Sequence, residues 1–290
     1  PTRSLLAANS HFGMAEGQIS ILKQEKVPCL LDGDGRLALD PNDSFRLLTK
    51  PHGHGDVHSL LHSSGIAKKL LAAGRTHLIF IQDTNALVFG GVPAALGVSI
   101  RHKLALNTIA VARKAGDASG ALMKLTKAKA KGKEKSKEKA AYIVNVEYNQ
   151  VDALVKASLD KRGDYNDSSG HSPFPGNTNQ LIFNLAEYVA TLDASGGAVP
   201  EFVNPKYADS SRTKFKSPTR LECMMQDLPW LMSPSSLVSF TILDAGLFYC
   251  PVKNSLADAA KKAKANQSPS SASIGDQALF AFNATLLSLS

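Results

Sequence analysis

The sequence predicts an α/β fold of three layers, with helices on both faces of a mixed, largely parallel sheet. One observation is the continuous apolar run Leu78–Ile81, which is typical of a strand buried on both faces. A second is that such runs alternate along the chain with segments of helical periodicity. A third is composition: 43% of the 290 residues are hydrophobic and 20% are charged, which suits a buried core and excludes a disordered or fibrous chain.

A helix is predicted over residues 57–73, directly before this strand. Leucines at positions 60, 61, 70 and 71 favour it, and Gly65 marks a break within it. Asp56 is placed to cap its beginning, and Gly74 fits its end.

Three more strands are predicted from apolar runs at residues 107–111, 142–146 and 237–243. Two stretches rich in Ser, Gly, Asn and Asp, residues 158–178 and 266–273, are predicted to be surface connections. Ligands of such α/β sheets gather at the carboxyl ends of strands, so polar residues just past a strand are the first candidates for a site.

Several classes of protein are excluded. The longest apolar stretch, residues 86–100, has 15 residues and contains two glycines and a proline, whereas a membrane span needs about 20. No secretory signal is visible over residues 1–10. The three cysteines have no metal-ligand spacing and cannot all pair, so we expect a reducing, cytoplasmic location.

The positive charge of the chain is concentrated in one segment. Residues 124–139 hold eight lysines and two glutamates, a net of +6 that leaves +2 of the total of +8 for the rest. The segment has no aromatic residue to stack on a base, so we interpret residues 124–140 as a solvated, Lys-rich inserted loop. A weak contact with an anionic surface is the alternative; nucleic-acid binding would depend on this run alone and is not expected.

The segment Lys50–Asp56 (KPHGHGD) carries the most information. Two glycines flank His54 just before a helix, an arrangement that lets the backbone approach a ligand and direct N–H groups at it. A loop that needs glycine only to turn would have the same pattern.

Histidines recur at positions 54, 58 and 62, which would place them on one face of a helix as a metal site. His54 precedes the expected helix, however, and no cysteine nearby completes a ligand set. We favour His58 and His62 as partly buried helix residues.

Other candidates each have two interpretations. Asp83 and Glu147 follow apolar strands; Asp83 could hold Mg²⁺ on a nucleotide phosphate or cap a turn. Lys253 could bind an anion or be solvated. Asn177 and Asn179 could bind sugar hydroxyls or serve a turn beside glycine. No motif of a covalent nucleophile, a zinc protease or a P-loop is present, which fits a reaction driven by positioning and charge.

Taken together, the motifs resemble those of the UDP-sugar pyrophosphorylases of plants, algae and protists, a branch of the UTP:sugar-1-phosphate uridylyltransferases. The matching stretches, in the family's order, are ILKQEKVPCL, RLALDP, TKPHGHGDVHSLL, FIQDTNAL, NVEYNQ, PFPGNTNQLI, EFVNPKY, RLECMMQD and PVKN. They run from about Asn9 to the end of the chain, so the resemblance covers nearly all of it.

The resemblance implies a glycosyltransferase-A-like fold and a role for each candidate residue. It implies uracil binding by Gln24, Gly53 and His54, and binding of sugar hydroxyls by Glu147, Asn177 and Asn179. It implies that Asp83 ligates Mg²⁺ near the phosphates and that Lys253 neutralises phosphate charge, which makes these two the catalytic residues.

The implied reaction converts UTP and a sugar 1-phosphate to a UDP-sugar and pyrophosphate. The family's Gly-Gly-x-Gly-x-Arg loop and its C-terminal domain are absent from residues 1–290, so we expect a single catalytic domain that is incomplete at both ends, with little turnover alone. The missing segments of the same enzyme are then possible partners; no membrane partner is expected. The alternative is a catalytically inactive relative that acts as a structural or interaction module.

Overall fold

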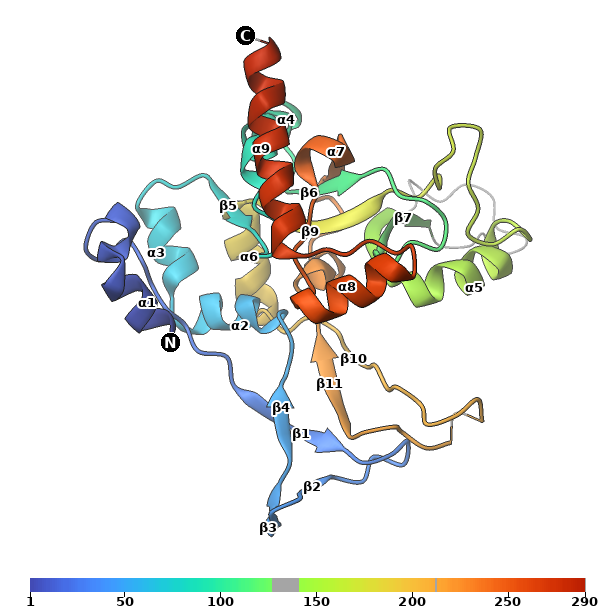
Figure 1. Ribbon diagram of the computed structural model, residues 1–290. Helices are drawn as coiled ribbons and strands as arrows, with labels where there is room; N and C mark the ends of the chain where they lie inside the picture. The colour runs from blue at the N-terminus through green and yellow to red at the C-terminus, as the bar shows by residue number, and fades with distance from the viewer. Residues whose placement is uncertain (127–140, 212, 290) are drawn as a thin grey trace, which may run out of the picture.

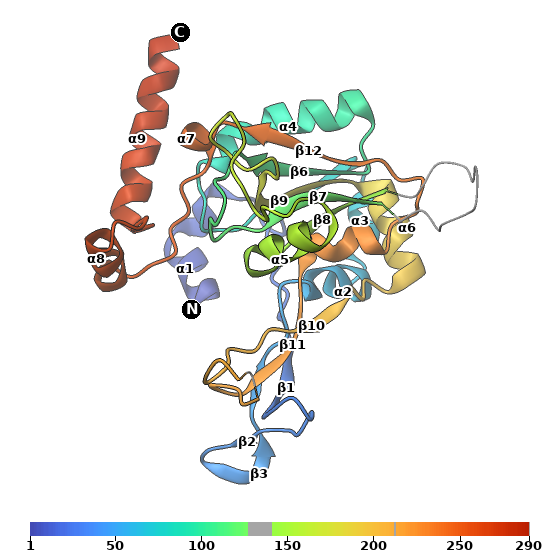
Figure 2. The same cartoon turned by 90° about the vertical axis from the view of Figure 1, so that its right-hand side faces the viewer.

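The computed structural model describes residues 1–126, 141–211 and 213–289. Most of the chain forms three layers, with α4 on one face of a central sheet and α2, α3 and α6 on the other (Figure 2). The predicted three-layer α/β class is confirmed. The predicted Lys-rich loop lies outside the described residues except for Lys124–Thr126, which belong to a strand.

The central sheet has the strand order β12-β6-β9-β7-β8, with β5 beside β9. Its strands are β5 (His77–Phe80), β6 (Leu106–Val111), β7 (Ala121–Thr126), β8 (Ala141–Val146), β9 (Gly176–Asn184) and β12 (Val238–Leu243). The four strands predicted from apolar runs are all present, as β5, β6, β8 and β12.

The sheet is mixed, and its parallel share is smaller than predicted. β5, β6, β7 and β12 share one direction, but within the described residues β12–β6 is the one parallel pair of neighbours. The reason is β9, which runs antiparallel between β5 and β6 and was not predicted as a strand. For neighbouring pairs, the expectation of a largely parallel sheet is therefore wrong.

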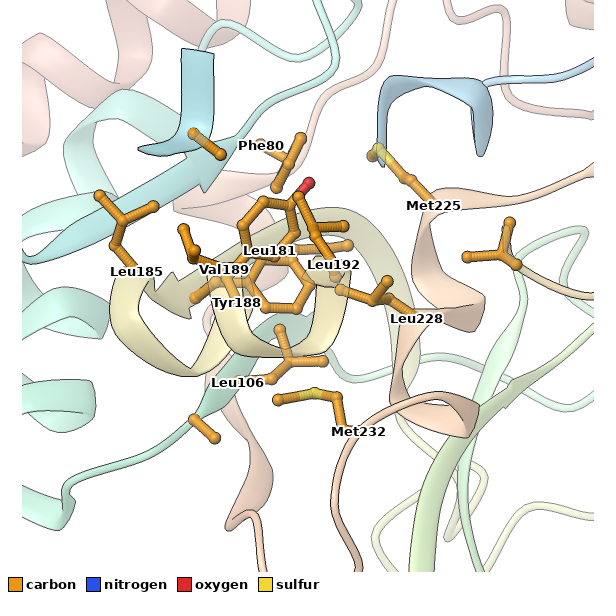
Figure 3. Packing of buried hydrophobic residues seen from close by; sticks show 14 of the residues in the cluster. Phe80, Leu106, Leu181, Leu185, Tyr188, Val189, Leu192, Met225, Leu228 and Met232 are labelled. Carbon is orange, nitrogen blue, oxygen red and sulfur yellow. The ribbon is translucent and has the colours of Figure 1, made fainter. Parts of the chain in front are cut away.

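One face of the sheet is covered by α4 (Val88–His102), which packs on Ile109, Ile182 and Leu243. The opposite face packs against α2 (Asp56–Ser63), α3 (Ile66–Ala72), α6 (Leu185–Ser195) and the 3₁₀ helix η2 (Met225–Trp230). Figure 3 shows Tyr188 of α6 among leucines of the sheet and of α6 at the centre of this second core. Such burial of apolar surface contributes roughly 25 cal/mol per Å² and dominates the stability of the domain.

The predicted helix over residues 57–73 is confirmed as α2 and α3, interrupted at Gly65, whose φ of 69° is left-handed. Gly74, with φ of 76°, follows the end of α3 as predicted. The predicted cap is wrong: α2 begins at Asp56, and its carboxylate instead accepts hydrogen bonds from His52 and Gln24.

The remaining part of the sheet is covered by α5 (Tyr148–Ser158), which packs through Val151 and Val155 on β7 and β8. A second, antiparallel sheet of order β10-β11-β1-β4 forms a separate lobe below the first (Figure 1). The strands of this lobe are β1 (Lys26–Leu30), β2 (Leu39–Asp40), β3 (Asp43–Leu47), β4 (Thr49–Pro51), β10 (Glu201–Val203) and β11 (Thr219–Cys223), of which β2 and β3 form a separate pair.

The terminal segments lie at the periphery. The N-terminal helices are α1 (Thr2–Ala8) and η1 (Ser10–Gly13), and the C-terminal helices are α7 (Ala245–Phe248), α8 (Leu256–Lys264) and α9 (Ala272–Leu289). α9 projects away from the domain in both views (Figures 1 and 2). Within the described residues, no helix combines the length and the apolar character needed to cross a bilayer.

Candidate functional site

A polar cavity of about 270 Å³ lies where β5, β8, β9 and β11 meet the loops that follow or precede them. Residues of the central sheet and residues that follow β4 and β11 of the second sheet contribute to its wall. The lining residues are His54, Gln82, Thr84, Asn85, Ala118, Ser119, Gly120, Asn145, Glu147, Tyr148, Asn177, Thr178, Asn179, Met224, Gln226, Tyr249, Pro251 and Lys253.

A ladder of amide side chains forms one wall. The Asn179 backbone N–H donates to Asn177 Oδ1 at 2.8 Å, and Asn177 Nδ2 donates to Asn145 Oδ1 at 3.0 Å. Asn145 Nδ2 in turn donates to Glu147 Oε1 at 2.7 Å. The ladder thus fixes the Glu147 carboxylate at the edge of the cavity, because one of its oxygens is held by an oriented donor.

The strand pairing explains why these residues meet. Ala121 of β7 lies opposite both Val146 of β8 and Gly176 of β9, so β7 joins the end of β8 to the beginning of β9. Gly120 precedes it, and a Cβ there would lie 2.2 Å from Asn145 Oδ1. Glycine is therefore needed at position 120 to leave room for the ladder.

Asn179 has a left-handed φ of 60° at a register shift of β9 against β6. Asparagine tolerates this conformation better than most residues, and the irregularity displaces its side chain from the regular alternation of the strand. Its buried Oδ1 has no hydrogen-bond partner among the described residues.

Gln226, which also lines the cavity, carries a second unpaired acceptor. Gln226 of η2 is 8% exposed, and its Nε2 lies 3.0 Å from Met224 Sδ while its buried Oε1 has no partner in the described chain. Buried polar atoms are nearly always paired in native proteins, so two unpaired acceptors in one cavity indicate a ligand that brings hydrogen-bond donors.

His54 forms part of the opposite wall, and the glycines beside it have a structural reason. Gly53 has φ of 154°, and a Cβ there would lie 2.2 Å from the Cys223 carbonyl oxygen. A Cβ on Gly55 would lie 2.8 Å from the Met224 backbone nitrogen, and the Gly55 N–H donates to the Cys223 carbonyl oxygen at 3.1 Å. The loop is therefore pressed against the end of β11 in a way that only glycine permits.

The hydrogen bonding of His54 determines its tautomer. The Met225 backbone N–H donates to His54 Nδ1 at 3.1 Å, and burial lowers the pKa of the imidazole. The ring is therefore neutral at pH 7 and carries its proton on Nε2. This Nε2–H has no partner within the described residues and can donate to a ligand.

Lys253 supplies the positive charge of the cavity. The segment that leads to Lys253 is held against the loop after β5 by Asn85. The Asn85 Nδ2 donates to the Phe248 carbonyl, and its Oδ1 accepts from the Cys250 N–H. A bond from Val252 N–H to Thr84 O at 2.8 Å strengthens this connection. Among the lining residues, Lys253 is the one permanent cation and Glu147 the one carboxylate.

The structure thus brings five of the predicted site residues into one cavity: His54, Glu147, Asn177, Asn179 and Lys253. Three others lie beside it. Gln24 and Gly53 are hydrogen-bonded to each other next to His54. Asp83 is exposed and lines a neighbouring cavity of about 170 Å³, which shares Thr84 with the larger one.

The donor set at Asp83 suits Mg²⁺ only in part. Two exposed carboxylates, Asp83 and Asp276, line this cavity, and neither belongs to a group of three potential ligands within the described residues. Because Mg²⁺ is commonly held by one or two carboxylates together with substrate phosphates, Asp83 fits that mode of binding and no other.

The histidines at positions 54, 58 and 62 do not share a ligand site. His58 is fully buried and bonded to Tyr188 and Met225, and His62 Nδ1 lies 3.7 Å from Asp193 Oδ1. The prediction that His58 and His62 are helix residues is confirmed, and His62 is partly buried as predicted, whereas His58 is fully buried in the core.

Sequence reasoning missed Asn145, Gln226 and Asn85. Asn145 gave a usable signal, because it is a polar residue inside the apolar run of β8. Gln226 and Asn85 gave none: their roles follow from contacts with segments distant in the sequence.

Comparison with known proteins identifies the family. Residues 2–212 match the family model described as UTP–glucose-1-phosphate uridylyltransferase. The chain belongs to this family. The resemblance stated from the motifs is therefore confirmed.

Curated relatives include UDP-sugar pyrophosphorylases of rice (Oryza sativa subsp. indica) and of Arabidopsis thaliana, which are 50% and 51% identical to this chain over 286 residues. These alignments cover 99% of the chain and 45% of each relative, so the chain spans a little under half of their length.

Solved structures show the same fold at low sequence identity. A UDP-glucose pyrophosphorylase mutant from Leishmania major, in complex with UDP-glucose, has a TM-score of 0.62 at 22% identity and covers 87% of this chain and 50% of its own. A UDP-N-acetylglucosamine pyrophosphorylase from Trypanosoma brucei has a TM-score of 0.65 at 17% identity, over 96% of this chain and 50% of its own. The chain therefore shares the fold of these pyrophosphorylases.

Proposed function

We propose that the cavity binds a UDP-sugar and that the protein transfers uridylyl groups from UTP to sugar 1-phosphates. The observation that carries this proposal is the pair of buried, unpaired acceptors, Asn179 Oδ1 and Gln226 Oε1, in a cavity whose one permanent cation is Lys253. A ligand rich in hydroxyl donors with an attached phosphate matches both features.

The sugar lies against the amide ladder. Glu147, Asn177 and Asn179 present oriented oxygens to its hydroxyls, and the bonds that join Asn177, Asn145 and Glu147 keep these side chains in place before the ligand arrives. Such preorganisation reduces the cost of ordering the site on binding.

The uracil lies against the segment of Gly53 and His54. His54 donates from Nε2 to a carbonyl of the base, because its Nδ1 is already occupied by the Met225 N–H. Gln24 Nε2 donates to the Gly53 carbonyl, which places Gln24 beside the segment that meets the base.

The phosphates extend toward Lys253 and the loop that carries Asp83. An oxygen of the sugar phosphate attacks the α-phosphorus of UTP, and pyrophosphate leaves; both reactants are anions, so the site has to align them against their repulsion. Lys253 offsets part of this charge. Mg²⁺ on Asp83 and the phosphate oxygens would supply the rest.

The free state of all three cysteines supports a reducing, cytoplasmic location. In this scheme no residue of the protein forms a covalent intermediate, because the oxygen of the sugar phosphate is itself the nucleophile.

Calorimetric titration with UDP-glucose tests the binding. Pyrophosphate release from UTP and glucose 1-phosphate, measured with the full-length protein from its natural source, tests the reaction. Lys253→Met is expected to lower turnover roughly 10²–10³-fold, the usual cost of losing one charge contact to the reacting group. Lys264→Met, on the exposed end of α8, is the matched control and should change nothing.

Asp83→Ala is expected to abolish the part of UTP binding that depends on Mg²⁺ and to leave metal-free UDP-glucose binding unchanged. Unchanged Mg²⁺ dependence would refute the metal assignment. Saturable UDP-glucose binding without any turnover would instead support the inactive, structural relative.

A further inference from the structure

Four side chains outside the cavity converge from four elements at the base of the His54 loop. His52 follows β4, Asp56 begins α2, Cys223 ends β11 and Glu201 begins β10. His52 Nδ1, Asp56 Oδ1 and Cys223 Sγ all lie within 4.8 Å of one another, and in the described part of the chain this is the one such group of three potential metal ligands.

The distances within the group approach those of a tetrahedral metal site. Bond lengths of roughly 2.0–2.3 Å from zinc to N, O and S place neighbouring ligand atoms about 3.4–3.6 Å apart. Cys223 Sγ lies 3.6 Å from His52 Nδ1 and 3.4 Å from Asp56 Oδ1. Only the third distance, 2.7 Å between His52 Nδ1 and Asp56 Oδ1, has to increase when a cation replaces the proton of the hydrogen bond between these two atoms.

The groups around these three residues are also those of a metal site. His52 Nε2 lies 3.0 Å from Glu201 Oε1, which is an ion-pair distance, but the two atoms do not meet the geometry of a hydrogen bond and Nε2 has no hydrogen-bond partner within the described residues. Gln24 Nε2 lies 3.1 Å from Asp56 Oδ2 and orients the second carboxylate oxygen. Metal-binding histidines commonly donate their other ring N–H to a carboxylate, and ligating carboxylates are commonly hydrogen-bonded in turn.

We infer that His52, Asp56 and Cys223 form a binding site for one Zn²⁺ ion, with water as the fourth ligand. The thiolate selects a soft or borderline cation over Mg²⁺ or Ca²⁺, and the mixed N, O and S set is typical of zinc. On binding, the Cys223 thiol and the His52–Asp56 pair release the protons that they hold in the metal-free protein. The ion connects β4 and α2 to β11 directly below His54.

The test uses the chain freed of metal with a chelator and then titrated with Zn²⁺ against a chromophoric competitor, and with Co²⁺ as the spectroscopic substitute. We expect one ion per chain and a thiolate-to-cobalt charge-transfer band. Cys223→Ser should weaken Zn²⁺ binding at least 100-fold and abolish the band. Cys29→Ser, a buried free cysteine on the neighbouring strand β1, is the matched control and should retain both.

His52→Ala should also lose the site, whereas His62→Ala should keep it. Glu201→Gln covers the case in which the buried variants do not fold, because this side chain is 46% exposed. It is expected to weaken Zn²⁺ binding 10–100-fold. Absence of stoichiometric Zn²⁺ binding, a cobalt spectrum without the sulfur band, or equal affinity in Cys223→Ser and Cys29→Ser would overturn the inference.

Discussion

His58 and Tyr188 are joined by a 2.8 Å hydrogen bond between Nδ1 and the hydroxyl in the centre of the larger core. The Met225 carbonyl lies 2.9 Å from Nε2 and can only accept, so Nε2 carries the proton and Nδ1 accepts from the tyrosine. This arrangement fixes the neutral imidazole and connects α2, α6 and η2.

The free energy of unfolding should therefore depend on pH through His58. Burial lowers its pKa from 6.5 to about 4, so between these values the unfolded chain binds the proton more readily than the folded chain. The contribution is present in full above pH 6.5 and is lost as pH falls toward 4, by about 3 kcal/mol in total. In urea titrations, the difference in stability between the wild type and His58→Gln should narrow by this amount from pH 7 to pH 4. A difference that stays constant over this range would contradict the prediction, and His62→Gln serves as control.

Gln226→Met exchanges the unpaired acceptor for an apolar group of similar size. The free protein should become more stable by about 1–2 kcal/mol, because a buried oxygen without a partner is removed. Binding of UDP-glucose should weaken at least tenfold at the same time, which calorimetry measures. Gln150→Met, on the exposed face of α5, should alter neither quantity. A loss of stability in Gln226→Met would show that Oε1 is paired in solution.

Gly120→Ala is expected to disrupt the amide ladder while preserving the fold. The new Cβ would lie 2.2 Å from Asn145 Oδ1, so the side chain has to leave both Asn177 and Glu147. UDP-glucose affinity should drop about tenfold or more for two lost oriented bonds. Gly97→Ala in α4 meets nothing within 4 Å and should raise stability by up to about 1 kcal/mol with unchanged binding. Equal affinities of the two variants would argue against the ladder as part of the sugar site.

Asp164→Asn should be the most destabilising surface-loop variant. Asp164 Oδ1 lies 2.6 Å from Arg113 Nη2, and the side chains are 6% and 2% exposed, so the variant leaves a buried guanidinium without its counter-charge. We expect a loss of about 3–5 kcal/mol in chemical denaturation. Asp160→Asn breaks an exposed pair with Arg162 in the same loop and should leave the free energy of unfolding nearly unchanged. Comparable losses in both would contradict the assignment of Arg113 to the core.

Local patterns were sufficient to predict β5, β6, β8 and β12, because each of these strands contains a run of mostly apolar residues. They were not sufficient for β9, whose first half, Asn177–Gln180, is polar and resembles a turn although it pairs with β6. The same polarity is what makes the strand part of the site. The lobe formed by β1, β4, β10 and β11 depends on the pairing of β1 with β11, for example Cys29 with Arg220, and no local signal reveals a pairing between segments so distant in the sequence.

The candidate site was predicted in part for the same reason. Residues at strand ends, such as Glu147, could be predicted from the fold class. Gln226 could not, because it reaches the cavity only through the packing of η2, which follows β11, against β8 of the central sheet. The spacing of His54, His58 and His62 suggested a shared role. In the structure, however, His58 lies in the core and His54 lines the cavity.

β9 carries Asn177 and Asn179 at one end and Leu181 and Phe183, both with no exposed surface, at the other. The same strand therefore lines the cavity and forms part of the core. Moving β9 so that the proposed site accepts a bulkier sugar would open voids beneath α6. Under the proposed function, a change of sugar preference would therefore come from substitutions at Gln226 and near Glu147, where side chains can vary without displacing β9.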